Sequence, residues 1–137
     1  MGVEYNGFKS DLTRVFFSCK INSLGKEIFG IVREAQTEAI QKIKPGIPAS
    51  DIDFAARRYI AGRGYGKNFL HSLGHGIGLE VHEEPSVSSK NQRKLKEGMV
   101  FTVEPAFYLP RKFGIRTEDM VLVTRKGVEI LSYDLNH

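Results

Sequence analysis

Three histidines lie within twelve residues of one another, in the segment HSLGHGIGLEVHE at residues 71–83. They are His71, His75 and His82, and apolar residues alternate along the same segment. Any one of them alone would be an incidental histidine in a solvated loop. Alternating apolar residues, however, require burial on one face, and an imidazole close to that face needs a polar partner. The segment therefore predicts histidines beside a buried sheet.

Four carboxylates occur at positions with strand-like flanks. Asp11 lies in FKSDLTRVF, Glu104 follows MVFTV, and Glu118 and Asp119 lie within GIRTEDMVLV. Taken singly, each is an outward-facing acid, but a carboxylate inside a strand is disfavoured unless it is paired or bound to a metal. Several carboxylates with one imidazole suit Mn, Co, Fe or catalytic Zn. Two metals that share carboxylates would activate a water, so the residues indicate a metal-dependent hydrolase.

Other chemistries have weaker support. Cys19 is the only cysteine and has no CxxC partner, no GxSxG elbow occurs, and GHGIG does not match GxGxxG. The net charge is +4 and the basic residues form scattered pairs, which indicates a solvated surface rather than nucleic-acid binding. The 137 residues fit one domain or part of a larger one. With no long apolar run, no signal-peptide pattern and one cysteine, we expect a cytoplasmic protein that does not bind membranes.

The elements that would position these residues are grouped by type. Residues 3–19 predict two strands, joined by a tight turn at Asn6-Gly7, with the second strand over 12–17. Apolar residues at steps of three and four then predict a helix over 24–43.

A second helix is predicted from Ser50, with Asp53 as its capping-box partner, and it ends at the following glycines. Short strands are predicted over 99–103, 115–124 and 128–131. Because the helices are grouped rather than alternating with strands, the fold class is α+β and not a doubly wound parallel sheet.

Four segments together resemble a known family. HSLGHGIGLEVHEEP, GMVFTVEPAFY, GIRTEDMVLVT and NGFKSDLTRVF are similar to motifs of the pita-bread-fold metallopeptidases, which include methionine aminopeptidases, Xaa-Pro aminopeptidases and Xaa-Pro dipeptidases (prolidases). The spacing of His71 and His75, and Arg116 two residues before Glu118, favour the Xaa-Pro branch. The resemblance implies the C-terminal portion of the pita-bread fold, with an antiparallel sheet backed by two helices, and a peptide substrate with proline at its second position.

The resemblance also implies a ligand set for two divalent metal ions. Asp11 and Glu118 would bridge the two metals, His75 would bind one of them, and Glu104 would bind that metal and shuttle a proton to and from the bridging water. The metal could be Mn, Co, Fe or Zn. These roles are consistent with the way in which a metal-bound water becomes a nucleophile at neutral pH.

Substrate contacts are implied for four further side chains. His71 and His82 would hold the substrate carbonyl or the transition-state oxyanion, since an imidazole beside developing negative charge stabilises it. Arg116 and Tyr108 would line the substrate pocket. Dipeptidase and aminopeptidase activity both remain open.

The family's first ligand is an aspartate eleven residues before the second, which places it one position before Met1. We therefore expect residues 1–137 to be a partial catalytic domain that lacks the N-terminal half of the fold, with a weakened second metal site and little or no activity. An uncovered sheet edge would favour self-association. The alternative is a non-catalytic protein- or peptide-binding module, because the family includes relatives that have lost their ligands.

Overall fold

The computed structural model describes residues 1–18 and 20–133, and this part of the chain holds two α-helices, one short 3₁₀ helix (Gly66–Asn68) and nine strands. The helices are α1 (Ser23–Ile40) and α2 (Ala49–Gly62). The strands, in chain order, are β1 (Gly2–Tyr5), β2 (Phe8–Asp11), β3 (Gly74–Gly76), β4 (Glu83–Val87), β5 (Val100–Val103), β6 (Ala106–Leu109), β7 (Phe113–Arg116), β8 (Asp119–Val123) and β9 (Val128–Ile130).

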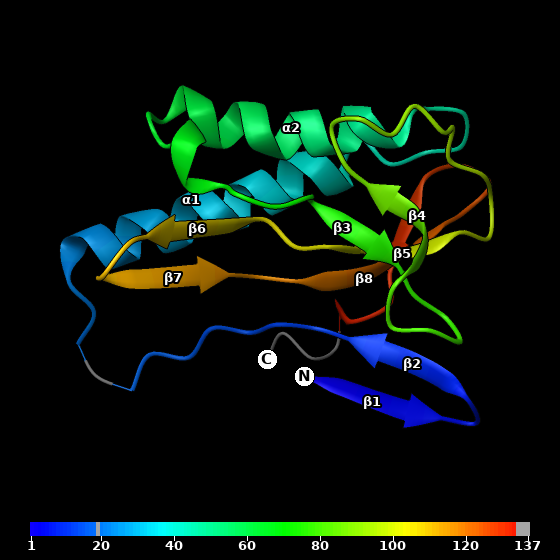
Figure 1. Cartoon of the computed structure of the whole chain (residues 1–137), viewed down its shortest axis with the longest axis horizontal. Helices are drawn as coiled ribbons and strands as arrows, with labels where there is room; N and C mark the ends of the chain where they lie inside the picture. The colour runs from blue at the N-terminus through cyan, green and yellow to red at the C-terminus, as the bar shows by residue number, and fades with distance from the viewer. Residues whose placement is uncertain (19, 134–137) are drawn as a thin grey trace.

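Five of the strands form an antiparallel sheet within the described residues, in the order β4-β3-β5-β8-β9. The strands β6 and β7 form a ribbon that continues the β5–β8 pair alongside α1, and the two helices lie together on one side of the strands (Figure 1). Buried apolar residues of both helices share one core with those of β4, β5 and β8. The predicted α+β arrangement of an antiparallel sheet backed by two helices is confirmed.

The first helix is close to its prediction. Asn22 caps it by accepting a hydrogen bond from the Gly25 amide at 2.8 Å. Its predicted apolar face is buried over Ile28, Val32 and Ala39. The helix ends at Ile40, three residues early, and the last predicted apolar residue, Ile43, is buried beyond the helix end.

The predicted capping box of the second helix is wrong. The cap is Pro48, which makes no side-chain capping bond, and Ser50 lies inside α2. Asp53 is fully buried and instead makes two hydrogen bonds with Arg57, at 2.8 and 2.9 Å, and accepts the Leu73 amide at 3.1 Å. The carboxylate therefore joins α2 to the start of the histidine segment rather than capping its own helix.

Two strand predictions are also corrected. The strand predicted over 12–17 is absent, since β2 ends at Asp11 and only Thr13 makes an isolated bridge, to Glu118. The strand predicted over 115–124 is divided into β7 and β8, because the Glu118 backbone leaves the β6–β7 ribbon and pairs with Thr13. Cys19, at the end of the predicted hairpin, lies outside the described residues.

The turn of the N-terminal hairpin lies at Asn6-Gly7 as predicted, with positive φ at both residues, but the second strand of the hairpin is β2 rather than 12–17. One face carries Asp11 together with the Glu4–Lys9 pair, and the Lys9 amide donates to the Gly78 carbonyl at 2.8 Å. The opposite face carries three exposed apolar side chains, Val3, Tyr5 and Phe8. The hairpin thus turns a polar face toward the rest of the chain and an apolar face away from it.

No helix within the described ranges combines the length and the apolar character that a bilayer crossing requires.

Candidate metal centre

Three of the predicted ligands meet at one point. Asp11 ends β2, His75 is the middle residue of β3, and Glu118 lies between β7 and β8. One ligand atom from each lies within 4.8 Å of those of the other two. Glu118 is buried, while the other two side chains are half-buried. The fold therefore brings together residues from three separate parts of the chain.

Glu104 joins this cluster through His75. Its Oε1 atom lies 3.2 Å from His75 Nε2, and the Thr102 hydroxyl donates to the same oxygen at 3.1 Å. Thr102 Oγ1 also accepts the backbone amide of His75 at 3.1 Å. A single threonine on β5 therefore orients both a predicted imidazole ligand and a predicted carboxylate ligand.

The glycines on either side of His75 allow this close approach. A Cβ atom at Gly74 would lie 1.8 Å from the Thr102 carbonyl oxygen, and one at Gly76 would lie 2.3 Å from the Glu84 carbonyl oxygen. No other residue type fits without moving backbone. The glycines let β3 lie tightly between β4 and β5, which fixes the position of the imidazole.

Negative charge is concentrated at the cluster. Burial raises the pKa of Glu118, and the charges of Glu104 and Asp11 add to the effect, while the hydrogen bond from Thr13 opposes it. The hydrogen bond with Glu104 raises the pKa of His75 despite burial. Burial disfavours ionisation of Glu104, but its contacts with His75, Thr102 and Arg116 outweigh burial and lower its pKa. The site therefore holds a surplus of carboxylates that attracts a cation.

The four predicted substrate residues lie in two places. His82 is exposed, and its ring stacks at a tilt on His75 with 4.1 Å between ring centroids. Arg116 is exposed and lies over the cluster, with Nη1 3.8 Å from Glu104 Oε2. His71 lies apart with Tyr108, whose hydroxyl is 3.3 Å from His71 Nε2. Two of the four thus contact predicted ligands, and the other two form a separate pair.

Residues 1–125 match metallopeptidase family M24. The chain belongs to this family. It is 50% identical to an uncharacterized peptidase of Staphylococcus aureus (strain bovine RF122 / ET3-1) over 133 residues. This alignment covers 97% of the chain and 38% of the Staphylococcus aureus protein.

Solved structures agree with the M24 assignment. The prolidase from Pyrococcus furiosus is 46% identical with a TM-score of 0.94, over 96% of this chain and 39% of that one. The X-Pro aminopeptidase from Thermotoga maritima MSB8 has the same identity and TM-score, over 96% and 37%. The chain has the pita-bread fold of these proteins, and it spans less than two fifths of their length.

The M24 chain's donor set fits a divalent metal ion. Three carboxylates and one imidazole converge, and this mixture of oxygen ligands with one nitrogen suits the divalent metals that act in hydrolysis. The carboxylate of Asp119, by contrast, does not join the cluster, because it faces away and bonds to Arg14 at 2.7 Å. The strand-interior position of Asp119 reflects a buried ion pair rather than a ligand.

Sequence reasoning missed two threonines of this M24 site. Thr13 donates to Glu118 Oε2 at 2.6 Å and accepts from the Arg116 guanidinium at 3.1 and 3.2 Å, and Thr102 holds Glu104 as described above. For Thr102, the only signal was a polar residue inside the apolar run MVFTV, which by itself has no single meaning.

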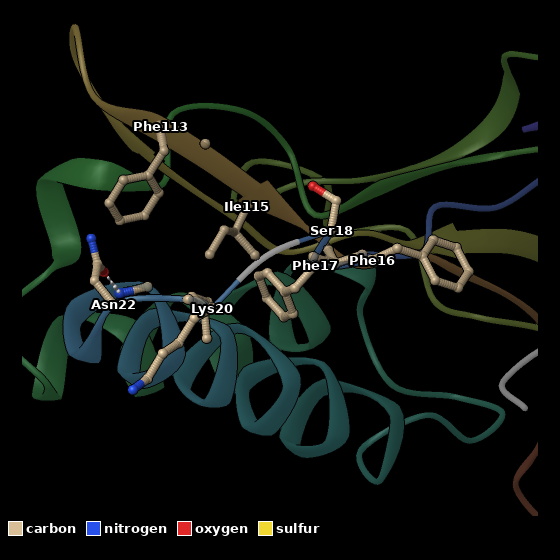
Figure 2. A pocket seen from close by; sticks show the side chains of 11 residues that line it. Phe16, Phe17, Ser18, Lys20, Asn22, Phe113 and Ile115 are labelled. Atoms are coloured by element: carbon tan, nitrogen blue, oxygen red, sulfur yellow. Dashed lines mark hydrogen bonds between the residues drawn. The ribbon is translucent and has the colours of Figure 1, made fainter.

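Two recesses of the described residues differ in polarity. An apolar pocket of about 440 Å³ lies between β7 and the segment leading into α1, where Phe17 and Ile115 point toward its interior (Figure 2). None of the predicted site residues lines it. A more polar recess of about 560 Å³ is lined by His71, Ser88 and Lys90, among others. The predicted site therefore adjoins the polar recess.

Proposed function

We propose that the chain carries the metal-binding part of an Xaa-Pro peptidase, which hydrolyses the bond between an N-terminal residue and proline as a dipeptidase or an aminopeptidase. The observation that supports this most directly is the meeting of Asp11, His75 and Glu118 within 4.8 Å, with Glu104 bonded to His75. The similarity to a prolidase and to an X-Pro aminopeptidase supports the proline preference.

Asp11, His75, Glu104 and Glu118 would hold one divalent metal ion tightly and share carboxylates with a second, weaker site, with Mn, Co, Fe and Zn as the candidates. Bound there, the metals would lower the pKa of a water and so supply a nucleophile at neutral pH. Glu104 is the residue we assign to proton transfer. Contacts with His75, Thr102 and Arg116 lower its pKa against the effect of burial, which favours the carboxylate form that can accept a proton, and its Oε1 lies 3.2 Å from His75 Nε2.

Substrate handling would fall to the residues beside the cluster. Arg116 lies over Glu104 with much of its side chain exposed, and its charge suits a peptide carboxylate. His82 lies against His75, where an imidazole can donate to developing negative charge. The paired His71 and Tyr108 would bind the peptide from the side of the polar recess.

The first experiment titrates the 137-residue chain with Mn²⁺ or Co²⁺ by calorimetry. We expect one tight equivalent, because the four assigned ligands complete one metal site and leave a second with shared carboxylates only. His75→Ala should abolish tight binding, whereas His71→Ala should leave it unchanged. A wild-type chain that binds neither metal would contradict the proposal, and two tight equivalents would contradict the weakened second site.

The second experiment follows release of proline from an Xaa-Pro dipeptide in long incubations with Mn²⁺. Slow turnover is expected, and Glu104→Gln should reduce it about 10²–10⁴-fold, since an amide cannot accept the proton. Equal rates in the two proteins would show that Glu104 does not transfer it. Tight metal binding with no turnover at all would instead support a non-catalytic peptide-binding module.

We also propose that the chain self-associates and acts on peptides in the cytoplasm. The exposed apolar face of the β1–β2 hairpin supports self-association, for which a concentration series by analytical ultracentrifugation is the test. A cytoplasmic location rests on the single cysteine, and peptides rather than nucleic acids or membranes are the proposed partners.

A further inference from the structure

A buried polar network lies behind the candidate metal centre and takes no part in the chemistry proposed above. Its central residue is Asp119, whose side chain is almost fully buried. The carboxylate accepts three hydrogen bonds, from Gln36 at 3.0 Å, Arg14 at 2.7 Å and Ser132 at 2.6 Å. Gln36 and Ser132 are each 4% exposed. Four polar side chains thus converge where the core of a small domain is normally apolar.

Gln36 connects helix α1 to the ends of two neighbouring strands, β5 and β8. Its amide nitrogen donates to the Val103 carbonyl at 3.0 Å and to Asp119 Oδ2 at 3.0 Å. Val103 and Asp119 face each other as the terminal pair of the β5–β8 ladder. Glu104 directly follows the end of β5, and Glu118 directly precedes the start of β8. One amide from α1 therefore spans the two strand ends from which both glutamates project.

Arg14 fixes the same region from the other side. Its guanidinium donates to the Glu118 carbonyl at 2.6 Å and to the Ser132 carbonyl at 3.0 Å, in addition to its ion pair with Asp119. Arg14 therefore holds the Glu118 backbone directly, through its carbonyl oxygen. It holds the neighbouring Asp119 through the side-chain carboxylate of that residue, which Gln36 and Ser132 also contact. The network leaves this backbone little freedom to move.

Stability alone gives a weak account of this arrangement. A buried ion pair with its hydrogen bonds roughly offsets its own desolvation, and well-packed apolar residues often serve as well. The bonds of the network are directed at the backbone on either side of two predicted ligands. Metal affinity, unlike packing, depends on the spacing of ligand atoms to within a few tenths of an ångström.

We propose that Gln36 is a positioning residue: its buried amide holds the ends of β5 and β8 at the separation that lets Glu104 and Glu118 bind a metal together. The inference rests on the proposed function, because it requires a metal at this site. Partners beyond the ligands typically contribute about 10–100-fold to metal affinity, and the loss of this amide should fall in that range.

The test compares Gln36→Met with Gln41→Met in the 137-residue chain. Methionine keeps the length of Gln36 and removes its donors, and Gln41 is an exposed residue just past the end of α1. Co²⁺ is titrated by calorimetry and by its visible absorption, at a temperature where circular dichroism shows both variants folded. Gln36→Met should lower Co²⁺ affinity about 10–100-fold and change the Co²⁺ absorption spectrum, and Gln41→Met should do neither.

A role in folding alone would lower the melting temperature of Gln36→Met but leave the affinity and the spectrum of the folded protein unchanged, and that result would overturn the proposal. If Gln36→Met does not fold, Ser132→Ala removes the bond to Asp119, together with the bond that Ser132 Oγ accepts from the Met120 amide at 3.1 Å, with a smaller change of shape. An unaltered Co²⁺ spectrum in that variant would also overturn it. A wild-type chain that binds no Co²⁺ would refute the metal centre itself, which separates the two failures.

Discussion

The predicted ligands are carried by two structural supports, the region of the five-stranded sheet and the β1–β2 hairpin, and these two supports differ in stability. His75, Glu104 and Glu118 come from the ends and middle of strands in or next to the five-stranded sheet, where Phe101 and Val103 are fully buried. Asp11 comes from the β1–β2 hairpin, all of whose β1 residues are exposed. An isolated two-stranded hairpin is marginally stable in water.

The contrast separates a preorganised part of the site from an adjustable one. The sheet fixes His75 and Glu104 through Thr102, whereas the hairpin is joined to the sheet region by few bonds, such as Lys9 N–H to the Gly78 carbonyl. Segments with few buried contacts open locally at low free energy. We therefore expect Asp11 to be the predicted ligand whose position would depend most on a bound metal.

Phe101→Ala should have the largest effect, because it removes a fully buried ring from β5 beneath the ligands. We expect a loss of about 3–5 kcal/mol in the free energy of unfolding, measured by urea denaturation. The matched control is Phe8→Ala in the hairpin, where 63% of the residue is exposed, and its effect should stay within about 0.5 kcal/mol. Similar losses from both would remove the distinction between the two supports.

Gly74→Ala should come next. The added methyl group would lie 1.8 Å from the Thr102 carbonyl oxygen, so β3 and β5 must separate. Overpacking of this kind costs about 1–3 kcal/mol or more, and Co²⁺ binding should weaken as His75 moves. Gly30→Ala is the control, since nothing lies within 4 Å of the new Cβ. In the middle of α1 it should stabilise the chain by about 0.5–1 kcal/mol.

Gly7→Ala should have the smallest effect on the whole chain and should act on the adjustable support only. Gly7 has a φ of 83° and open space around it, so alanine strains the turn by about 1 kcal/mol without a clash. The urea midpoint should be unchanged, while Co²⁺ affinity falls less than tenfold as Asp11 becomes harder to place. Unchanged Co²⁺ affinity would mean that the turn does not govern the position of Asp11.

A related measurement needs no substitution. Hydrogen exchange without metal should show little protection for the amides of β1 and β2 and strong protection for those of β5 and β8. Addition of Co²⁺ should increase protection in the hairpin more than in the sheet, because Asp11 gains a partner only then. Equal gains in both regions would indicate that the hairpin is already fixed.

Periodicity and turn chemistry predicted the elements whose signals are local. The buried face of α1 and the Asn6-Gly7 turn follow from short-range patterns, and the four short motifs predicted the family. The break between β7 and β8 was missed because it depends on Thr13, a residue 105 positions from its partner Glu118. The network around Gln36 was missed for the same reason, since a polar residue on an apolar helix face carries no sign of which distant group it meets.

That separation of 105 positions also sets an order of events in folding. The entropy cost of closing a loop grows with the logarithm of its length, and contacts between distant parts of a chain slow folding. The β5–β8 pair and its ribbon close much shorter loops and can form first. Asp11 is synthesised before the other predicted ligands, but we expect it to reach its place after them, so that a metal ion would be captured late in folding and would not template the sheet.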